Sequence, residues 1–312
     1  VRGFQNGPVV ARFPVQAWSP NDSSAVIDVT DLFLTYRQEF GAVQGTVKDR
    51  SWFEHVAAFP RNIEVEATQT GSARAAGAAQ TAPTTPQTVR MHWSFMKLPD
   101  QPMMPRYSDN RVGYFSSSYY DFSSREHESE LKRIIHRFRL EPKDMAAFQR
   151  GELVEPKQPI IYWIDPPTPE WMKPWVKVGV DKWNKAFEAA GFKNAIRGEY
   201  APANDPDWSI YDMRHSIIYW RPSTVANATG GGVTDPRTGE LLKGEVNMYH
   251  NIMELQREWY FVQVSPLDPR AQTLPLPDSL MGRMVEYVVT HEVGHSIGLP
   301  HNMKSSAMYP VD

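Results

Sequence analysis

Hydrophobic and polar positions alternate in several short stretches of the first third of the chain. The alternation is clearest at residues 62–67 and 89–95, and an apolar run lies at residues 25–29. Successive side chains of a β-strand point to opposite faces, so this period of two predicts strands. Residues 71–88 consist mostly of Gly, Ser, Ala, Gln, Thr and Pro. That composition predicts a mobile loop, which would join two paired strands.

Longer elements with a different pattern follow residue 158. The apolar run at residues 160–164 predicts a buried strand, and Pro169 can open a helix that runs to about Ala190. Gly191 is placed where it can end this helix. The helix has one apolar face at helical spacing, formed by Val176, Val180, Trp183 and Phe187.

The pattern after residue 191 predicts two further strands, a hairpin and a last helix. Strands are expected at residues 195–199 and 216–220, and a hairpin is expected around the turn signal Asp235–Gly239. The last element is a helix from about Asp278 to Ile297. In the first half of the chain, the polar pattern of residues 126–138 predicts another helix.

Composition changes at residues 155–159, where we place a domain boundary. The pattern therefore predicts an α+β protein with two parts. Residues 1–155 would form a β-rich N-terminal accessory domain, and residues 156–312 an α/β catalytic domain.

Composition limits the candidate partners and metal ligands of the chain. The chain has 312 residues, is 41% hydrophobic and 22% charged, and carries a net charge of -3, which is typical of a globular protein without a nucleic-acid partner. It contains no cysteine, so His and carboxylates are the candidate ligands for a transition metal. No apolar run reaches the roughly 20 residues that a transmembrane helix requires. Because the chain begins at Val1 rather than at Met, we expect a processed or partial chain.

The predicted last helix carries a metal-ligand pattern. His291 and His295 are four residues apart, so their imidazoles lie one turn apart on the same face. Gly298 can end the helix through a positive φ angle, and His301 can then return as a third ligand. Three protein ligands leave a fourth position of tetrahedral zinc open, as in catalytic sites. Glu292, beside the first ligand, can reach a zinc-activated water and act as general base and acid.

This pattern is that of the metzincin metallopeptidases, which the chain resembles. Metzincins have a methionine-containing turn beneath the zinc, and residues 306–310 around Met308 are similar to it. The element order after residue 158 also resembles the metzincin upper subdomain, with a twisted mixed sheet, a backing helix and an active-site helix. The resemblance implies a zinc-dependent endopeptidase. It also implies an edge strand near residues 228–233 that binds peptide, with Gly230, Gly231 and Gly232 as substrate-binding residues; a flexible hairpin arm is the alternative for these glycines.

Three segments narrow the resemblance to a family of large secreted bacterial metzincins of the Bacteroidetes type. They are residues 26–33, 111–115 and 291–306. This resemblance implies a secreted or periplasmic, cell-envelope location.

Two rival functions stay open. The chain could be a zinc-containing binding module for peptides or partner proteins that cleaves nothing, or a zinc amidase acting on a non-protein substrate. Latency is a separate hypothesis: with no cysteine present, Asp109 could occupy the open zinc position, although a turn-forming role beside Asn110 is the simpler interpretation.

Overall fold

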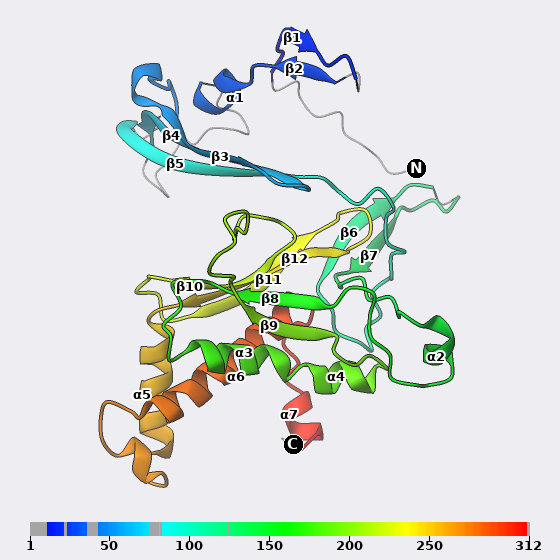
Figure 1. The fold of residues 1–312 in the computed structure, drawn as a ribbon, viewed down its shortest axis with the longest axis vertical. Helices are drawn as coiled ribbons and strands as arrows, with labels where there is room; N and C mark the ends of the chain where they lie inside the picture. The colour runs from blue at the N-terminus through cyan, green and yellow to red at the C-terminus, as the bar shows by residue number, and fades with distance from the viewer. Residues whose placement is uncertain are drawn as a thin grey trace. The chain divides into compact units, whose positions relative to one another are not determined.

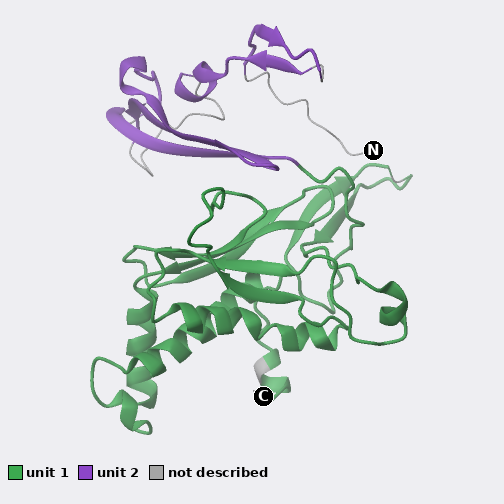
Figure 2. Cartoon of the chain, viewed as in Figure 1, with its two compact units in different colours: residues 1–3, 98–312 green, residues 4–97 purple. Residues whose placement is uncertain are grey.

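The computed structural model describes residues 11–21, 24–35, 43–74, 81, 83–123 and 125–310, which form two compact units. The N-terminal unit lies within residues 4–97, and the C-terminal unit contains the described residues from Leu98 onward (Figure 2). The boundary predicted at residues 155–156 falls inside the C-terminal unit rather than between the two. Within the described residues, no helix combines the length and apolarity needed to cross a bilayer.

The N-terminal unit is built on a three-stranded antiparallel sheet. Strand β4 is central and pairs with β5 along its whole length and with β3 over residues 63–68. Phe33 of helix α1 makes edge-on contacts with three aromatic rings of this sheet, at centroid distances of 5.2 to 6.1 Å. The elements are β1 (Val15–Trp18), β2 (Ala25–Ile27), α1 (Thr30–Leu34), the 3-10 helix η1 (Lys48–Arg50), β3 (Trp52–Ala58), β4 (Asn62–Ala73) and β5 (Thr85–Met96).

The predicted pairing of two strands across the low-complexity segment is confirmed. Strands β4 and β5 are longer than the alternation indicates, since they extend to Ala73 and begin at Thr85. Residues 75–80 and 82 of the predicted mobile loop lie outside the described residues.

The C-terminal unit contains a five-stranded mixed sheet in the order β11-β12-β10-β8-β9 (Figure 1). Strand β11 lies at the edge and is antiparallel to β12, whereas the other pairs are parallel. The mixed sheet and the edge hairpin agree with the predicted catalytic fold. The strands are β8 (Ile160–Ile164), β9 (Ile196–Tyr200), β10 (Ser216–Arg221), β11 (Ala228–Thr234) and β12 (Leu241–Tyr249).

Helices α3, α5 and α6 lie on one side of this sheet (Figure 1). The apolar stripe of α3 enters the main core, where Val176 and Val180 are almost completely buried beside Val289 of α6. Two glycines allow α3 and α6 to approach closely. A Cβ atom at Gly179 would lie 2.9 Å from the carbonyl oxygen of Glu286, and one at Gly282 would meet the Trp175 ring.

The helices of this unit are α2 (Met145–Gln149), α3 (Lys173–Asp181), α4 (Asn184–Ala189), α5 (Ile252–Val264), η2 (Pro269–Ala271), α6 (Asp278–Ser296) and α7 (Ser305–Met308). The predicted helix at residues 169–190 is thus divided in two. The side-chain amide of Asn184 donates to the carbonyl of Asp181 at 3.0 Å and to that of Ile196 at 2.6 Å. This side chain therefore competes with the helical backbone and ties the break to β9.

The predicted helix at residues 126–138 is wrong. This segment contains strand β7 (Glu130–Ile135), which pairs antiparallel with β6 (Ser116–Asp121). Cross-strand pairing overrides the local polar pattern here. Helix α5 is a further element that the pattern did not indicate.

Residues that follow β7 connect its hairpin to the five-stranded sheet. The backbone of Arg137 accepts from the N–H of Leu241 at 2.8 Å and donates to the carbonyl of Gly239 at 3.0 Å. Arg139 forms an ion pair with the largely buried carboxylate of Glu240 at 2.6 Å. Residues well before 155 are therefore part of the unit that carries the metal-ligand pattern.

Candidate metal centre

Helix α6 and the turn after it bring three histidines together. The rings of His291 and His295 lie one turn apart, with centroids separated by 4.7 Å. The Nε2 atom of His301 lies 3.0 Å from that of His291 and 3.1 Å from that of His295. Among the described residues, these three form a group whose candidate ligand atoms all lie within 4.8 Å of one another. The sequence-predicted ligands therefore meet at one point.

A hydrogen bond to the turn after helix α6 orients the His295 ring. Its Nδ1 atom donates to the carbonyl oxygen of Leu299, 2.7 Å away. With the proton on Nδ1, the Nε2 atom keeps its lone pair and faces the other two histidines. The backbone of the turn thus selects the tautomer that can bind a metal.

Gly298 makes the return of His301 possible. Its φ angle is +114°, a conformation that side chains disfavour, and a Cβ atom there would lie 2.3 Å from the carbonyl oxygen of His136. Helix α6 ends at Ser296, and the N–H of Leu299 still bonds to the carbonyl of Gly294 at 3.0 Å. The predicted role of Gly298 in ending the helix agrees with this geometry.

The three histidines fit zinc. Ligand nitrogens about 2.0–2.1 Å from a tetrahedral zinc lie about 3.3 Å apart, close to the spacing observed here. Burial lowers the pKa of His291, and the neighbouring His295 and His301 lower it further, which favours the neutral form that ligates metal. The chain has no cysteine to complete a closed structural site.

Glu292 lies on helix α6, and its backbone packs against strand β11. The residue is only 7% exposed, and burial raises its pKa, although the neighbouring His295 and Gly230 act in the opposite direction. The predicted general base is therefore next to the first ligand, and its backbone lies against the edge strand.

The three glycines of β11 differ in their surroundings. A Cβ atom at Gly230 would lie 1.9 Å from the carbonyl oxygen of Glu292, and one at Gly232 would lie 2.4 Å from that of Lys243. At Gly231 the same position is open. Close packing within the protein accounts for two of these glycines, so their predicted contact with substrate stays a prediction.

Met308 is the last residue of the short helix α7 and is 62% exposed. Most of its side-chain surface is thus in solvent rather than packed under the histidines. Its assignment to a methionine turn stays a prediction.

A segment from the first half of the chain contacts the site. The Phe115 ring lies 5.8 Å from that of His295, and its backbone N–H donates to the carbonyl of Gly298 at 2.8 Å. His136 contacts the same turn through its carbonyl oxygen. No ligand spacing links these residues to the histidines, so spacing arguments miss them; residues 111–115 stood out only through the family resemblance.

Asp109 participates in a local turn. Its carboxylate accepts from the backbone N–H of Arg111 at 2.9 Å and forms an ion pair with that side chain at 2.6 Å. These bonds lower its pKa. The turn-forming interpretation accounts for its contacts.

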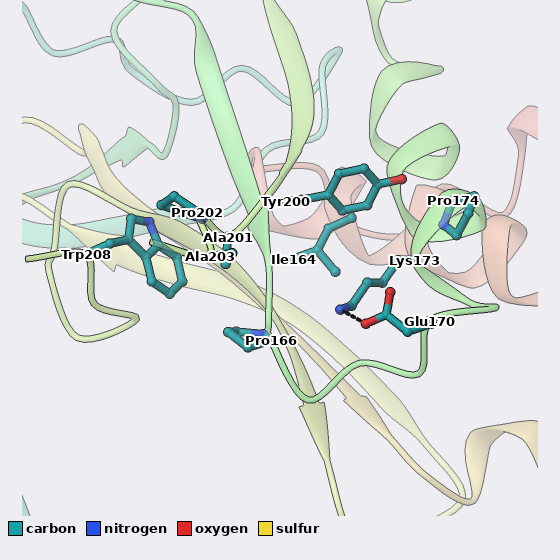
Figure 3. A pocket seen from close by; sticks show the side chains of 10 residues that line it. All are labelled: Ile164, Pro166, Glu170, Lys173, Pro174, Tyr200, Ala201, Pro202, Ala203 and Trp208. Carbon is teal, nitrogen blue, oxygen red and sulfur yellow. Dashed lines mark hydrogen bonds and ion pairs between the residues drawn. The ribbon is translucent and has the colours of Figure 1, made fainter. Parts of the chain in front are cut away.

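A separate pocket of about 490 Å³ lies where β8 and β9 end, against the start of α3 (Figure 3). Aromatic and proline residues make up half of its lining, and Lys173 pairs with Glu170 within it. None of the three histidines lines it.

Comparison with family models yields two matches. Residues 1–143 match a domain of unknown function, DUF5117, and residues 273–312 match a family described as Met-zincin, DUF4953. No curated protein and no solved structure matches the chain. The second match contains all three histidines and Glu292, so the segment that carries the candidate metal centre is similar to a Met-zincin.

Proposed function

We propose that this protein is a zinc-dependent endopeptidase. The observation that carries the proposal is the convergence of His291, His295 and His301 beside the buried carboxylate of Glu292, within a segment that matches Met-zincin.

Different residues of the chain would carry out different steps of the hydrolysis. A zinc ion held by the three histidines would polarise the scissile carbonyl and acidify water. The Glu292 carboxylate accepts the proton of the attacking water and then delivers it to the leaving amine.

Strand β11 offers a place for the peptide. It is the edge of the sheet and packs against α6 at Glu292, so an extended peptide added to this edge would pass the metal centre. Backbone hydrogen bonds of that kind recognise many sequences, which suits an endopeptidase.

The resemblance to large secreted bacterial metzincins supports export to the envelope or the medium. Fractionation of the producing cells tests this part, and recovery of the chain only in the cytosol would refute it.

The decisive test uses denatured casein as substrate. The zinc-loaded protein should cleave it, the chelated protein should not, and Glu292→Ala should bind one zinc and lose at least about 10²-fold in rate. Turnover retained by Glu292→Ala would refute the assignment. Peptide binding without cleavage by the zinc-loaded wild type would favour the binding module instead.

A further inference from the structure

We infer that Phe115 forms one wall of the substrate subsite beside His295 and receives a large apolar side chain of the peptide. This inference rests on the proposed peptidase function and adds to it a residue that selects substrate.

The position of the ring carries the inference. Phe115 is 40% exposed, and its ring lies 5.8 Å from that of His295 at an angle of 50°. The edge strand contacts the same histidine, because a Cβ atom at Gly230 would lie 2.9 Å from the His295 Cβ. His295 therefore has contacts with both the peptide-binding edge and an exposed aromatic ring. A peptide bound at this ligand passes within reach of Phe115.

Backbone hydrogen bonds fix the position of Phe115. The N–H of Phe115 donates to the carbonyl of Gly298 at 2.8 Å, and its carbonyl accepts from the N–H of His136 at 2.8 Å. The His136 ring is in turn bonded to the hydroxyl of Ser117, 2.8 Å away. Both backbone groups of Phe115 are thus tied to elements of the site. A pre-organised aromatic surface binds an apolar side chain without a large ordering cost.

The apolar Phe115 ring indicates which class of peptide side chain it can bind. A half-exposed phenyl ring gains free energy when an aliphatic or aromatic side chain covers it, and it offers nothing to a charged carboxylate. Phe115 also belongs to residues 1–143, which match DUF5117. The inference therefore places a residue of this region in the proposed peptidase site.

The test compares two variants of the same hairpin region. Phe115→Ala removes the ring, and Phe122→Ala removes a ring that is 60% exposed and lies tilted against Tyr120, with centroids 6.4 Å apart. Cleavage of a peptide library by each zinc-loaded protein is read by mass spectrometry. Phe115→Ala should lower the preference for large apolar residues at one substrate position by about tenfold. Phe122→Ala should keep the wild-type profile.

A second measurement does not depend on turnover. In the Glu292→Ala background, a fluorescent peptide with Phe at the preferred position should bind about tenfold more weakly after Phe115→Ala. Phe115→Leu keeps an apolar side chain and should lie between the two. Zinc content and thermal unfolding confirm that each variant is folded.

The outcomes separate this inference from the proposed function. If the wild type cleaves peptides and Phe115→Ala leaves both profile and binding unchanged, the inference is overturned. A loss of zinc without a change in the residual profile would also overturn it, because the ring would then act only on His295. If the wild type cleaves nothing, the proposed function itself fails.

Discussion

At the scale of single residues, Gly230 and Gly231 are neighbours in β11 with opposite surroundings. The Cβ position of Gly230 is occupied by the Glu292 backbone, whereas that of Gly231 is open. The same residue type thus serves different ends at adjacent positions. For Gly230, the missing side chain allows the edge strand to contact the active-site helix at the backbone of Glu292.

This difference predicts unequal effects of the same substitution. Gly230→Ala should lower the free energy of unfolding by about 2 kcal/mol, because the added methyl forces β11 and α6 apart. Casein hydrolysis should fall with it, since the added methyl displaces the backbone of Glu292. The matched Gly231→Ala should change stability by less than about 0.5 kcal/mol. Denaturant unfolding of both variants checks this, and equal losses would contradict it.

At the scale of elements, the end of helix α6 decides whether the third histidine reaches the other two. Gly298 has a φ of +114° and no room for a Cβ beside His136. Gly298→Ala should therefore displace His301 and weaken zinc binding by at least about tenfold, equivalent to about 1.4 kcal/mol. Competition with a chromogenic chelator measures this affinity.

Gly151 provides the control for backbone strain. Its φ is +83°, it lies after α2, and its Cβ position is open. Gly151→Ala carries a comparable strain away from the histidines, so it should lower stability and leave zinc affinity unchanged. Equal zinc affinity in the Gly298→Ala and Gly151→Ala proteins would show that the turn does not position His301.

Elements also differ in how far the local pattern determines them. Helix α6 follows the prediction almost to the residue, because its proline start and its turn signals are local. Strand β7 was predicted as a helix, because its pairing partner β6 is not indicated by its own residues. In helix α5 several large apolar residues, Trp259 and Val262 among them, are exposed, so the apolar positions do not mark one buried face.

At the scale of the whole molecule, the division near Leu98 predicts which fragments retain the site. Residues 98–312 include Phe115, His136 and the strands that contact α6, so this fragment should bind one zinc with the affinity of the full chain. Residues 156–312 lack the backbone hydrogen bond from Phe115 to Gly298 and should bind zinc at least about tenfold more weakly. Calorimetry of both fragments checks this. Equal affinities would restore the boundary at residues 155–156.

Metal removal should affect the two units differently. A ligand that binds only the folded state stabilises it, by about 2.7 kcal/mol at a free concentration of 100 times Kd. Zinc should therefore raise the thermal unfolding temperature of the C-terminal unit and leave that of residues 4–97 unchanged. Calorimetric scans with and without chelator measure both transitions. A shift in both would contradict a site confined to one unit.

The sequence by itself determined the three candidate metal ligands, the carboxylate beside them and the helix that presents them, because four-residue spacing and a glycine stop are local properties of the chain. It also indicated the order of strands after residue 158 and the pairing of β4 with β5. Only the tertiary structure decided that residues 98–155 belong to the unit of the metal centre, and that Phe115 and His136 contact its turn. Those contacts join positions more than 150 residues apart, and the pattern around each position gives no sign of its distant partner.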